Sequence, residues 1–287
     1  MKCKTILDSL CLFVLLSILS CSSDRSKQPT EQANDTSGSV SKTTARPAYW
    51  AYEGEDGPAA WATLSPAYAI CGEGKNQSPI NIEKLHISTG AHWSLNYKNT
   101  SLHIAHNEHM NDIIDNGHTI QANVDAGSSF TFQSKTYRLK QFHFHTPSEH
   151  TIDGQQLPME IHLVHQASDG SLAVIAILVT EGKKRNENLD KIIANLPDAK
   201  GESRHMKTDS INVDIHMPKD NHAYHYIGSL TTPPCAENVQ WLVLRQTIVA
   251  TADQIKAFSS RIGHNNRPTQ PLNGRAVQLE DLKAKVE

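Results

Sequence analysis

The stretch that decides the fold is Lys140-Gln141-Phe142-His143-Phe144-His145, in which polar and apolar side chains alternate. Alternation with a period of two predicts a β-strand that buries one of its faces. Successive side chains of a strand point to opposite faces, so Phe142 and Phe144 are expected in the core. His143 and His145 then project together from the other face. Taken alone, this H-x-H pattern is also what an ordinary polar strand face contains.

Comparable patterns continue on both sides of this strand. Strands are predicted at 129–133, 140–145, 160–164, 172–179 and 241–244. The run at 172–179 is apolar without interruption, which is typical of a strand buried on both faces. Helical spacing occurs in Leu189–Leu196 and again in Thr251–Ile262, where a capping box opens the segment. The sequence therefore predicts a mainly β protein, with a large sheet that carries a few surface helices.

A third histidine is expected to join His143 and His145. His162 lies in a second strand pattern, between Ile161 and Leu163. If the two strands pair antiparallel through the connection 146–159, His162 meets the other two histidines across the ladder. Three neutral imidazoles with an open fourth position make the ligand set of a catalytic zinc site rather than a closed structural one.

Two polar residues are placed to support these histidines. Histidines that bind a metal usually donate their other N–H to a carboxylate or a carbonyl, which fixes the tautomer. Glu160 and Gln141 each lie two residues from a histidine and share its strand face. The alternative interpretation of both residues is exposed polarity on a sheet surface.

The net charge of the chain indicates whether a nucleic acid is an expected partner. The chain has 287 residues with 27 basic and 30 acidic side chains, a net charge of −3. Proteins that bind nucleic acid through a general surface usually show a strongly basic domain or stripe. We therefore expect no nucleic-acid partner.

The N-terminal residues predict export. Lys2 and Lys4 precede a short apolar run at 10–19, which has the length of a signal-peptide core and is too short to span a membrane. The run ends in Ile18-Leu19-Ser20-Cys21, which resembles the lipobox of bacterial lipoproteins, where the cysteine becomes the lipidated N-terminus. The alternative is an ordinary signal peptide that is cut nearby.

A polar tether is predicted to follow. Residues 22–46 hold too few apolar side chains to offset the entropy of ordering them. We predict a signal peptide at 1–20, a lipidated N-terminus and flexible tether at 21–46, and a single domain at 47–287. The protein is then expected to be a membrane-anchored lipoprotein in the periplasm or on the cell surface. Its contact with the membrane is made through Cys21 alone.

Several motifs together resemble the α-class carbonic anhydrases, and they occur in the family's order between Trp50 and Arg275. They are QSPINI at 77–82, NGH at 116–118, QFHFH at 141–145, SEH at 148–150, EIHLVH at 160–165, GSLTTPPC at 228–235 and RPTQPL at 267–272. The resemblance implies the family's fold, a single domain around a large, mostly antiparallel central β-sheet. It also implies the family's reaction, the zinc-dependent, reversible hydration of carbon dioxide to bicarbonate and a proton. Sulfonamides and anions are then the expected inhibitors.

The resemblance assigns roles to individual residues. It implies that His143, His145 and His162 bind Zn²⁺, with Gln141 and Glu160 behind them. Thr231 matches the threonine that donates to Glu149 and orients the reacting oxygen, and His118 matches the histidine that carries protons out. A turn histidine is the alternative for His118. The polar wall that orders water is assigned to Tyr52, Asn116 and Gln121, and the substrate pocket to Val164, Val174, Leu230, Thr232 and Trp241.

The resemblance also implies a disulfide. Cys71 and Cys235 match positions that extracellular members of the family bridge, so we expect a disulfide beside the loop that carries Thr231.

Two alternative functions remain. A carbonic-anhydrase-like domain that has lost catalysis and serves binding or adhesion is the first alternative function, although such domains usually lack a ligand histidine. A zinc esterase is the second alternative.

Overall fold

Two long antiparallel strands, β6 (Lys135–His145) and β9 (Met159–Ala167), lie at the middle of the sheet in this computed structural model. The structure describes residues 48–83, 93–96, 99–105, 118–124, 127–132, 135–197, 199–212, 220 and 222–281. All of them belong to the unit Ala45–Glu287. The predicted signal peptide, Cys21 and the tether lie outside the described residues.

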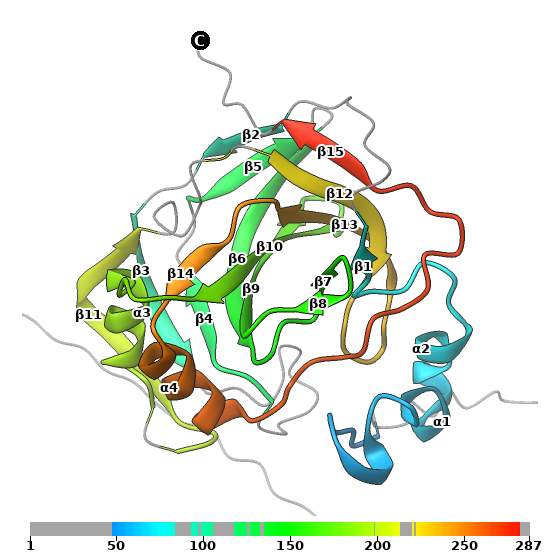
Figure 1. Cartoon of the computed structure of the whole chain (residues 1–287), viewed down its shortest axis with the longest axis horizontal. Coiled ribbons are helices and arrows are strands. Elements are labelled where there is room, and N and C mark those ends of the chain that lie inside the picture. The colour runs from blue at the N-terminus through cyan, green and yellow to red at the C-terminus, as the bar shows by residue number, and fades with distance from the viewer. Residues whose placement is uncertain are drawn as a thin grey trace, which may run out of the picture. The chain divides into compact units, whose positions relative to one another are not determined.

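The large sheet has twelve described strands in the order β11-β3-β4-β6-β9-β10-β13-β12-β15, with β2, β5 and β14 beside this path (Figure 1). Their bounds are β2 (Trp93–Asn96), β3 (Asn99–Ala105), β4 (Gln121–Val124), β5 (Ser129–Phe132), β10 (Leu172–Glu181), β11 (Ser203–Asn212), β12 (His222–Ser229), β13 (Glu237–Leu244), β14 (Ile248–Ala250) and β15 (Gln278–Asp281). A second sheet is formed by β1 (Asn81–Ile82), β7 (Thr151–Ile152) and β8 (Gln155–Gln156). The prediction of a large, mostly antiparallel sheet is confirmed, although β10 pairs in parallel with β13 and with β14.

The described helices are short. They are η1 (Gly54–Asp56), α1 (Trp61–Leu64), η2 (Pro66–Tyr68), α2 (Ile70–Glu73), α3 (Glu187–Ile193) and α4 (Ala252–Ile262). The two predicted helical segments correspond to α3 and α4. The capping box of α4 is confirmed, with Thr251 and Gln254 bonded to each other's backbone N–H. Among the described residues, no helix combines the length and the apolar character that crossing a membrane requires.

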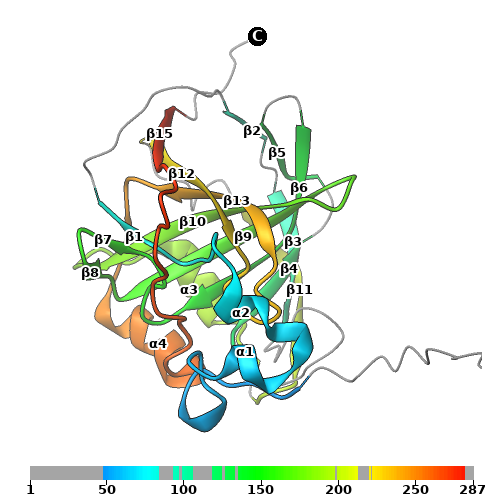
Figure 2. The same cartoon turned by 90° about the vertical axis from the view of Figure 1, so that its right-hand side faces the viewer.

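Strand β10 is buried on both faces, and this divides the apolar core in two. One set of its side chains joins a cluster covered by α3 and α4, which pack side by side on the sheet (Figures 1 and 2). The other set, which includes Val174, joins a cluster with Trp241 and Tyr226. The continuous apolar run at 172–179 is explained by these two cores.

A β-bulge interrupts the alternation of β6. Leu139 pairs with His165, whereas Gln141 pairs with Val164, so Lys140 is an extra residue in the ladder. A bulge shifts which face the following side chains occupy. Leu139 and Phe142 therefore both lie in the apolar core although they are three residues apart, and Gln141 and His143 lie on the opposite face.

The segment that follows α4 runs beside the N-terminal helices (Figure 2). Arg267 donates to the carbonyl oxygens of Cys71 and Ser78 at 2.7 and 2.8 Å, and Gln270 donates its backbone N–H to Pro79. These contacts tie residues that are far apart in the sequence to the same side of the sheet.

Candidate active site

The three predicted histidines come together on one face of the sheet. His143 is the direct cross-strand partner of His162, as antiparallel pairing required. Ring centroids lie 5.0 Å apart for His143 and His145, 5.2 Å for His143 and His162, and 4.5 Å for His145 and His162. One nitrogen of each ring lies within 4.8 Å of the other two, close enough for all three to hold one metal ion.

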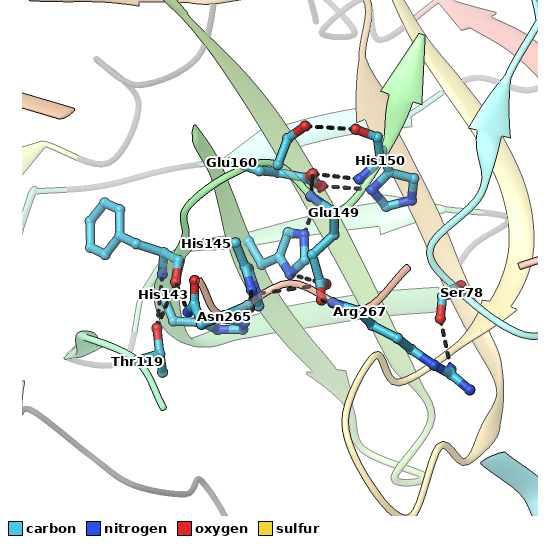
Figure 3. Close-up of polar contacts among 12 residues, drawn as sticks. Ser78, Thr119, His143, His145, Glu149, His150, Glu160, Asn265 and Arg267 are labelled. Carbon is cyan, nitrogen blue, oxygen red and sulfur yellow. Dashed lines mark hydrogen bonds and ion pairs between the residues drawn. The ribbon is translucent and has the colours of Figure 1, made fainter. Parts of the chain in front are cut away.

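Each histidine is held from behind by one hydrogen bond. His143 Nδ1 donates to Gln141 Oε1 at 3.0 Å, and His162 Nε2 donates to Glu160 Oε1 at 2.7 Å. His145 Nδ1 donates to the backbone carbonyl of Asn265 at 2.7 Å. Figure 3 shows Asn265 beside His145. The nitrogens left over are Nε2 of His143 and His145 and Nδ1 of His162.

Burial keeps the three imidazoles neutral. Desolvation lowers the pKa of His143 well below its usual value and the pKa of His145 to about 4. The pKa of His162 is also lowered by burial, although the charge of Glu160 opposes the shift. Near pH 7 the remaining ring nitrogens therefore present lone pairs, as metal ligands must.

Glu149 lies next to two of these rings. Its Oε2 is 3.7 Å from His145 Nε2 and 3.9 Å from His162 Nδ1, and its Oε1 accepts the backbone N–H of Arg267 at 2.8 Å. Burial raises the pKa of Glu149 to about 7, against the effects of His162, of the Arg267 N–H and of a hydrogen bond from the Thr231 side chain. Thr231 is therefore close enough to Glu149 to lower the pKa of its carboxyl, and its predicted role in orienting the reacting oxygen stays a prediction.

A second buried network surrounds Glu160. Its Oε2 accepts the backbone N–H groups of Glu149 and His150, both at 2.8 Å, and its Oε1 accepts His150 Nδ1 at 2.6 Å (Figure 3). Burial by itself raises the pKa of a carboxyl, but His150 and His162 hold the pKa of Glu160 well below its usual value. His150 Nε2 lies 2.7 Å from the Tyr226 hydroxyl. Glu160 therefore fixes His162 and the backbone of Glu149 at the same time.

The histidines lie in a cavity of about 320 Å³. All five side chains predicted for the substrate pocket line it, namely Val164, Val174, Leu230, Thr232 and Trp241. Val174 and Trp241 are almost fully buried, and Trp241 Nε1 donates to the carbonyl of Ser229. This apolar wall faces the three rings and leaves room for a small, nonpolar molecule between them.

The comparisons with known proteins agree with this geometry. The model of the eukaryotic-type carbonic anhydrase family matches residues 56–281. This chain is a member of that family. A carbonic anhydrase of Pectobacterium atrosepticum is 42% identical over 230 residues, which cover 80% of this chain and 90% of the relative.

Solved structures show the same fold. The α-carbonic anhydrase of Thermovibrio ammonificans, in complex with the inhibitor sulfanilamide, superimposes with a TM-score of 0.74 at 37% identity and covers 80% of this chain and 99% of that one. Dioscorin complexed with ascorbate has a TM-score of 0.71 at 26% identity, with 82% and 99% covered. The fold predicted from the resemblance is therefore confirmed.

The residues of the family's polar wall are only partly brought together. Tyr52 and His118 line the cavity. Gln121 is the cross-strand neighbour of His143, but it is buried and its Nε2 donates to Asn123. Asn116 lies outside the described residues. A water network through these groups stays a prediction.

His118 lies packed against Trp50 on the cavity wall. Its Nε2 donates to the carbonyl of Trp50 at 3.0 Å, and its ring packs on the Trp50 ring at 4.3 Å. Burial lowers the pKa of His118 to about 4, against the effect of that carbonyl. In this position the ring is neutral near pH 7.

The predicted disulfide is present between Cys71 and Cys235. Cys235 donates its backbone N–H to the carbonyl of Thr232 at 2.8 Å. The bridge therefore braces the loop that places Thr231 in the cavity. Oxidised cysteines are typical of compartments outside the cytosol.

Sequence reasoning missed Asn265 as a supporting residue. Gln141 and Glu160 each lie two residues before the histidine that they hold, but position 143, two residues before His145, is itself a histidine. The absence of a polar partner two residues before His145 is the one sign in the sequence that its partner comes from elsewhere in the chain. It did not indicate Asn265, which is 120 positions away.

Proposed function

We propose that this chain catalyses the reversible hydration of carbon dioxide to bicarbonate and a proton, with Zn²⁺ as its cofactor. The observation that carries the proposal is the set of three neutral ring nitrogens in an apolar cavity, each ring held from behind by one acceptor. His145 Nε2 is fully buried and has no hydrogen-bond partner among the described residues. A buried polar atom without a partner is costly, so this nitrogen fits a metal ligand.

The donor set fits zinc in particular. Three histidines with an open fourth position are the ligands of catalytic zinc, and a hydrogen bond behind each ring fixes its tautomer. When bound, Zn²⁺ supplies a Lewis acid that lowers the pKa of water to about 7, as is known for carbonic anhydrases generally.

Glu149 and Thr231 orient the attacking oxygen. Thr231 lines the cavity and lowers the pKa of Glu149, and when the carboxylate of Glu149 accepts the hydroxyl hydrogen of Thr231, the lone pairs of that hydroxyl are free to face the cavity. The lone pairs of the Thr231 hydroxyl can accept a hydrogen bond only from an attacking oxygen that still carries a proton. This hydrogen bond turns a lone pair of the attacking oxygen toward the substrate. The apolar wall of Val164, Val174 and Trp241 holds carbon dioxide, which has no dipole to pair with a polar group.

His118 is proposed to carry the excess proton from the cavity to solvent. It lines the cavity next to Tyr52, with their ring centroids 5.2 Å apart. Since burial against Trp50 lowers its pKa, we propose that proton uptake requires the ring to leave that position. Replacement by alanine should then slow the proton step, and imidazole buffer should restore part of the rate.

The decisive experiment measures carbon dioxide hydration and zinc content of the same preparations, with and without a sulfonamide. The wild-type chain should contain one zinc, hydrate carbon dioxide and be inhibited. His162→Ala should lose both the metal and the activity, whereas His222→Ala, which removes a surface histidine that pairs with Asp220, should keep both. Undiminished hydration by a zinc-free variant would contradict the mechanism.

Two other functions are separated by the same assays. A domain that only binds a ligand would hold the fold but show no hydration, and the fold alone does not exclude this. The complete set of His143, His145, His162, Glu149 and Thr231 favours catalysis. An esterase would hydrolyse activated esters faster than it hydrates carbon dioxide, and we propose ester cleavage only as a side activity.

We also propose export and a lipid anchor. The proposed arrangement is a signal peptide at 1–20, a lipidated Cys21 with a tether to 46, and the catalytic domain at 47–287. The disulfide supports an oxidising compartment, the periplasm or the cell surface. Metabolic labelling with a palmitate analogue should mark the wild type and not Cys21→Ser, and equal labelling of both would remove the anchor.

A further inference from the structure

The rim of the cavity carries a cation that the proposed reaction does not use. Lys140 lines the cavity together with Gln166 and Leu172, and its side chain is exposed. Among the described residues, no hydrogen bond or ion pair engages its ammonium group. Lys135, on the same strand, is instead paired with Asp169 at 2.7 Å.

The β-bulge is what places this lysine on the rim. With regular alternation, only one of two neighbouring residues can face the cavity. Because Lys140 is the extra residue of the bulge, it lines the cavity although its neighbour Gln141 also lies on the face of His143, and both stand between the buried Leu139 and Phe142. Bulges next to active sites commonly redirect a side chain in this way.

The charge of Lys140 is not balanced within the cavity. None of the described residues that line it is an aspartate or a glutamate. Lys140 lines the same cavity as the apolar residues Val164 and Leu172, and the residue that follows it, Gln141, pairs with Val164 across the ladder. A charge next to a low-dielectric wall acts on ligands more strongly than one in open water.

We propose that Lys140 forms a subsite for a carboxylate-type anion at the mouth of the cavity. This inference rests on the proposed function, because its ligands are those that enter the zinc cavity. Two kinds of ligand carry such an anion. One is bicarbonate as it enters or leaves the cavity, and the other is a longer ligand that binds the metal with one end and carries a carboxylate at the other. Carbon dioxide and neutral ligands gain nothing from this charge.

The test compares two zinc-binding probes of nearly equal size, benzenesulfonamide and 4-carboxybenzenesulfonamide, by isothermal titration calorimetry. In the wild type, the ratio of their affinities should favour the anionic probe, and Lys140→Gln should reduce this ratio about fivefold, the weight of one partly exposed charge. Lys140→Arg should retain most of the ratio. Lys135→Gln is the matched control and should leave the ratio unchanged.

A second arm distinguishes the source of the anion. In the dehydration reaction, the KM for bicarbonate should rise about threefold in Lys140→Gln at low salt, and the difference should shrink at high salt, where the charge is screened. A change in the carboxylate probe alone assigns the subsite to longer ligands. An unchanged probe ratio together with an unchanged KM would overturn the subsite. Failure of the wild type to bind either sulfonamide would overturn the proposed function and the subsite with it.

Discussion

The two sides of the three histidines are built differently. Behind the rings, Gln141, Glu160 and Asn265 are fixed by hydrogen bonds of 2.7–3.0 Å, and the two side-chain acceptors are almost fully buried. In front, Thr231 and His118 reach into an open cavity. We therefore expect the rear residues to set the stability of the fold and its affinity for the metal, and the front residues to set reaction rates and ligand preference. Substitutions on each side can break this division.

The largest effect is expected behind the rings. Glu160→Ala leaves His150, His162 and two backbone N–H groups without their acceptor in a buried site. Breaking such a buried charged network costs about 3–5 kcal/mol, and loss of a supporting group lowers metal affinity by about 10–100-fold. Urea unfolding and zinc competition with a chelator measure both. Glu160→Gln, which keeps the size of the side chain, should be milder, and an unfolding free energy equal to that of the wild type in Glu160→Ala would contradict the division.

The disulfide should give the next largest effect on stability. Replacement of Cys71 and Cys235 together by serine removes a bridge across 164 positions of sequence, which should lower the free energy of unfolding by about 2–5 kcal/mol. Zinc content should not change, because the bridge touches none of the three rings. Urea unfolding of oxidised and reduced wild type provides the control. Free reaction of both thiols in the native, non-reduced protein would contradict the bridge.

In front of the rings, Thr231→Val should lower kcat about 100-fold, the usual cost of removing one oriented hydrogen-bonding group from an active site. Metal affinity and the free energy of unfolding should remain those of the wild type. Thr232→Val is the matched control. Thr232 lines the same cavity, but it is not among the groups that shift the pKa of Glu149. Loss of zinc from Thr231→Val would show that the two sides are not separable.

The smallest effect concerns the pH dependence of His118. Its pKa is about 4 in the folded chain and about 6.5 when unfolded. The unfolded state therefore binds the proton first, so the stability that the neutral ring contributes is complete above pH 6.5 and is lost as pH falls toward 4. Nuclear magnetic resonance titration of the ring should give the low pKa, and His118→Gln should flatten this part of the stability profile. A ring that titrates near pH 6.5 would contradict the burial of His118.

The sequence predicted the elements that carry the site because their patterns are local. Alternation placed His143 and His145 on one face, and one assumption, antiparallel pairing, brought His162 to them. The same alternation also led to an error of detail. It treats Lys140 as an ordinary strand residue, whereas the register between β6 and β9 shifts at this position. The two adjacent polar residues Lys140 and Gln141, which interrupt the alternation between Leu139 and Phe142, are the local sign of this shift.

The residues that support the site from distant parts of the chain could not be predicted from local sequence patterns. Asn265 and Arg267 follow α4 in an irregular segment, and their contacts to His145 and Glu149 span 120 and 118 positions. The resemblance included the motif that begins at Arg267, but a motif does not show which of its backbone groups form hydrogen bonds with the site. His150 was likewise part of a motif, and its bond to Glu160 became evident only from the packed structure.

The place of Asn265 in the chain has a consequence for the order in which the protein is made. A ribosome delivers the strands with His143, His145 and His162 long before it delivers the carbonyl that orients His145. Until α4 has emerged and the segment after it has docked, two of the three rings have their acceptors and the third does not. We therefore expect tight metal loading to depend on the docking of this late segment. A chain cut after β13 and α4, which also lacks the edge strand β15, should bind zinc more weakly.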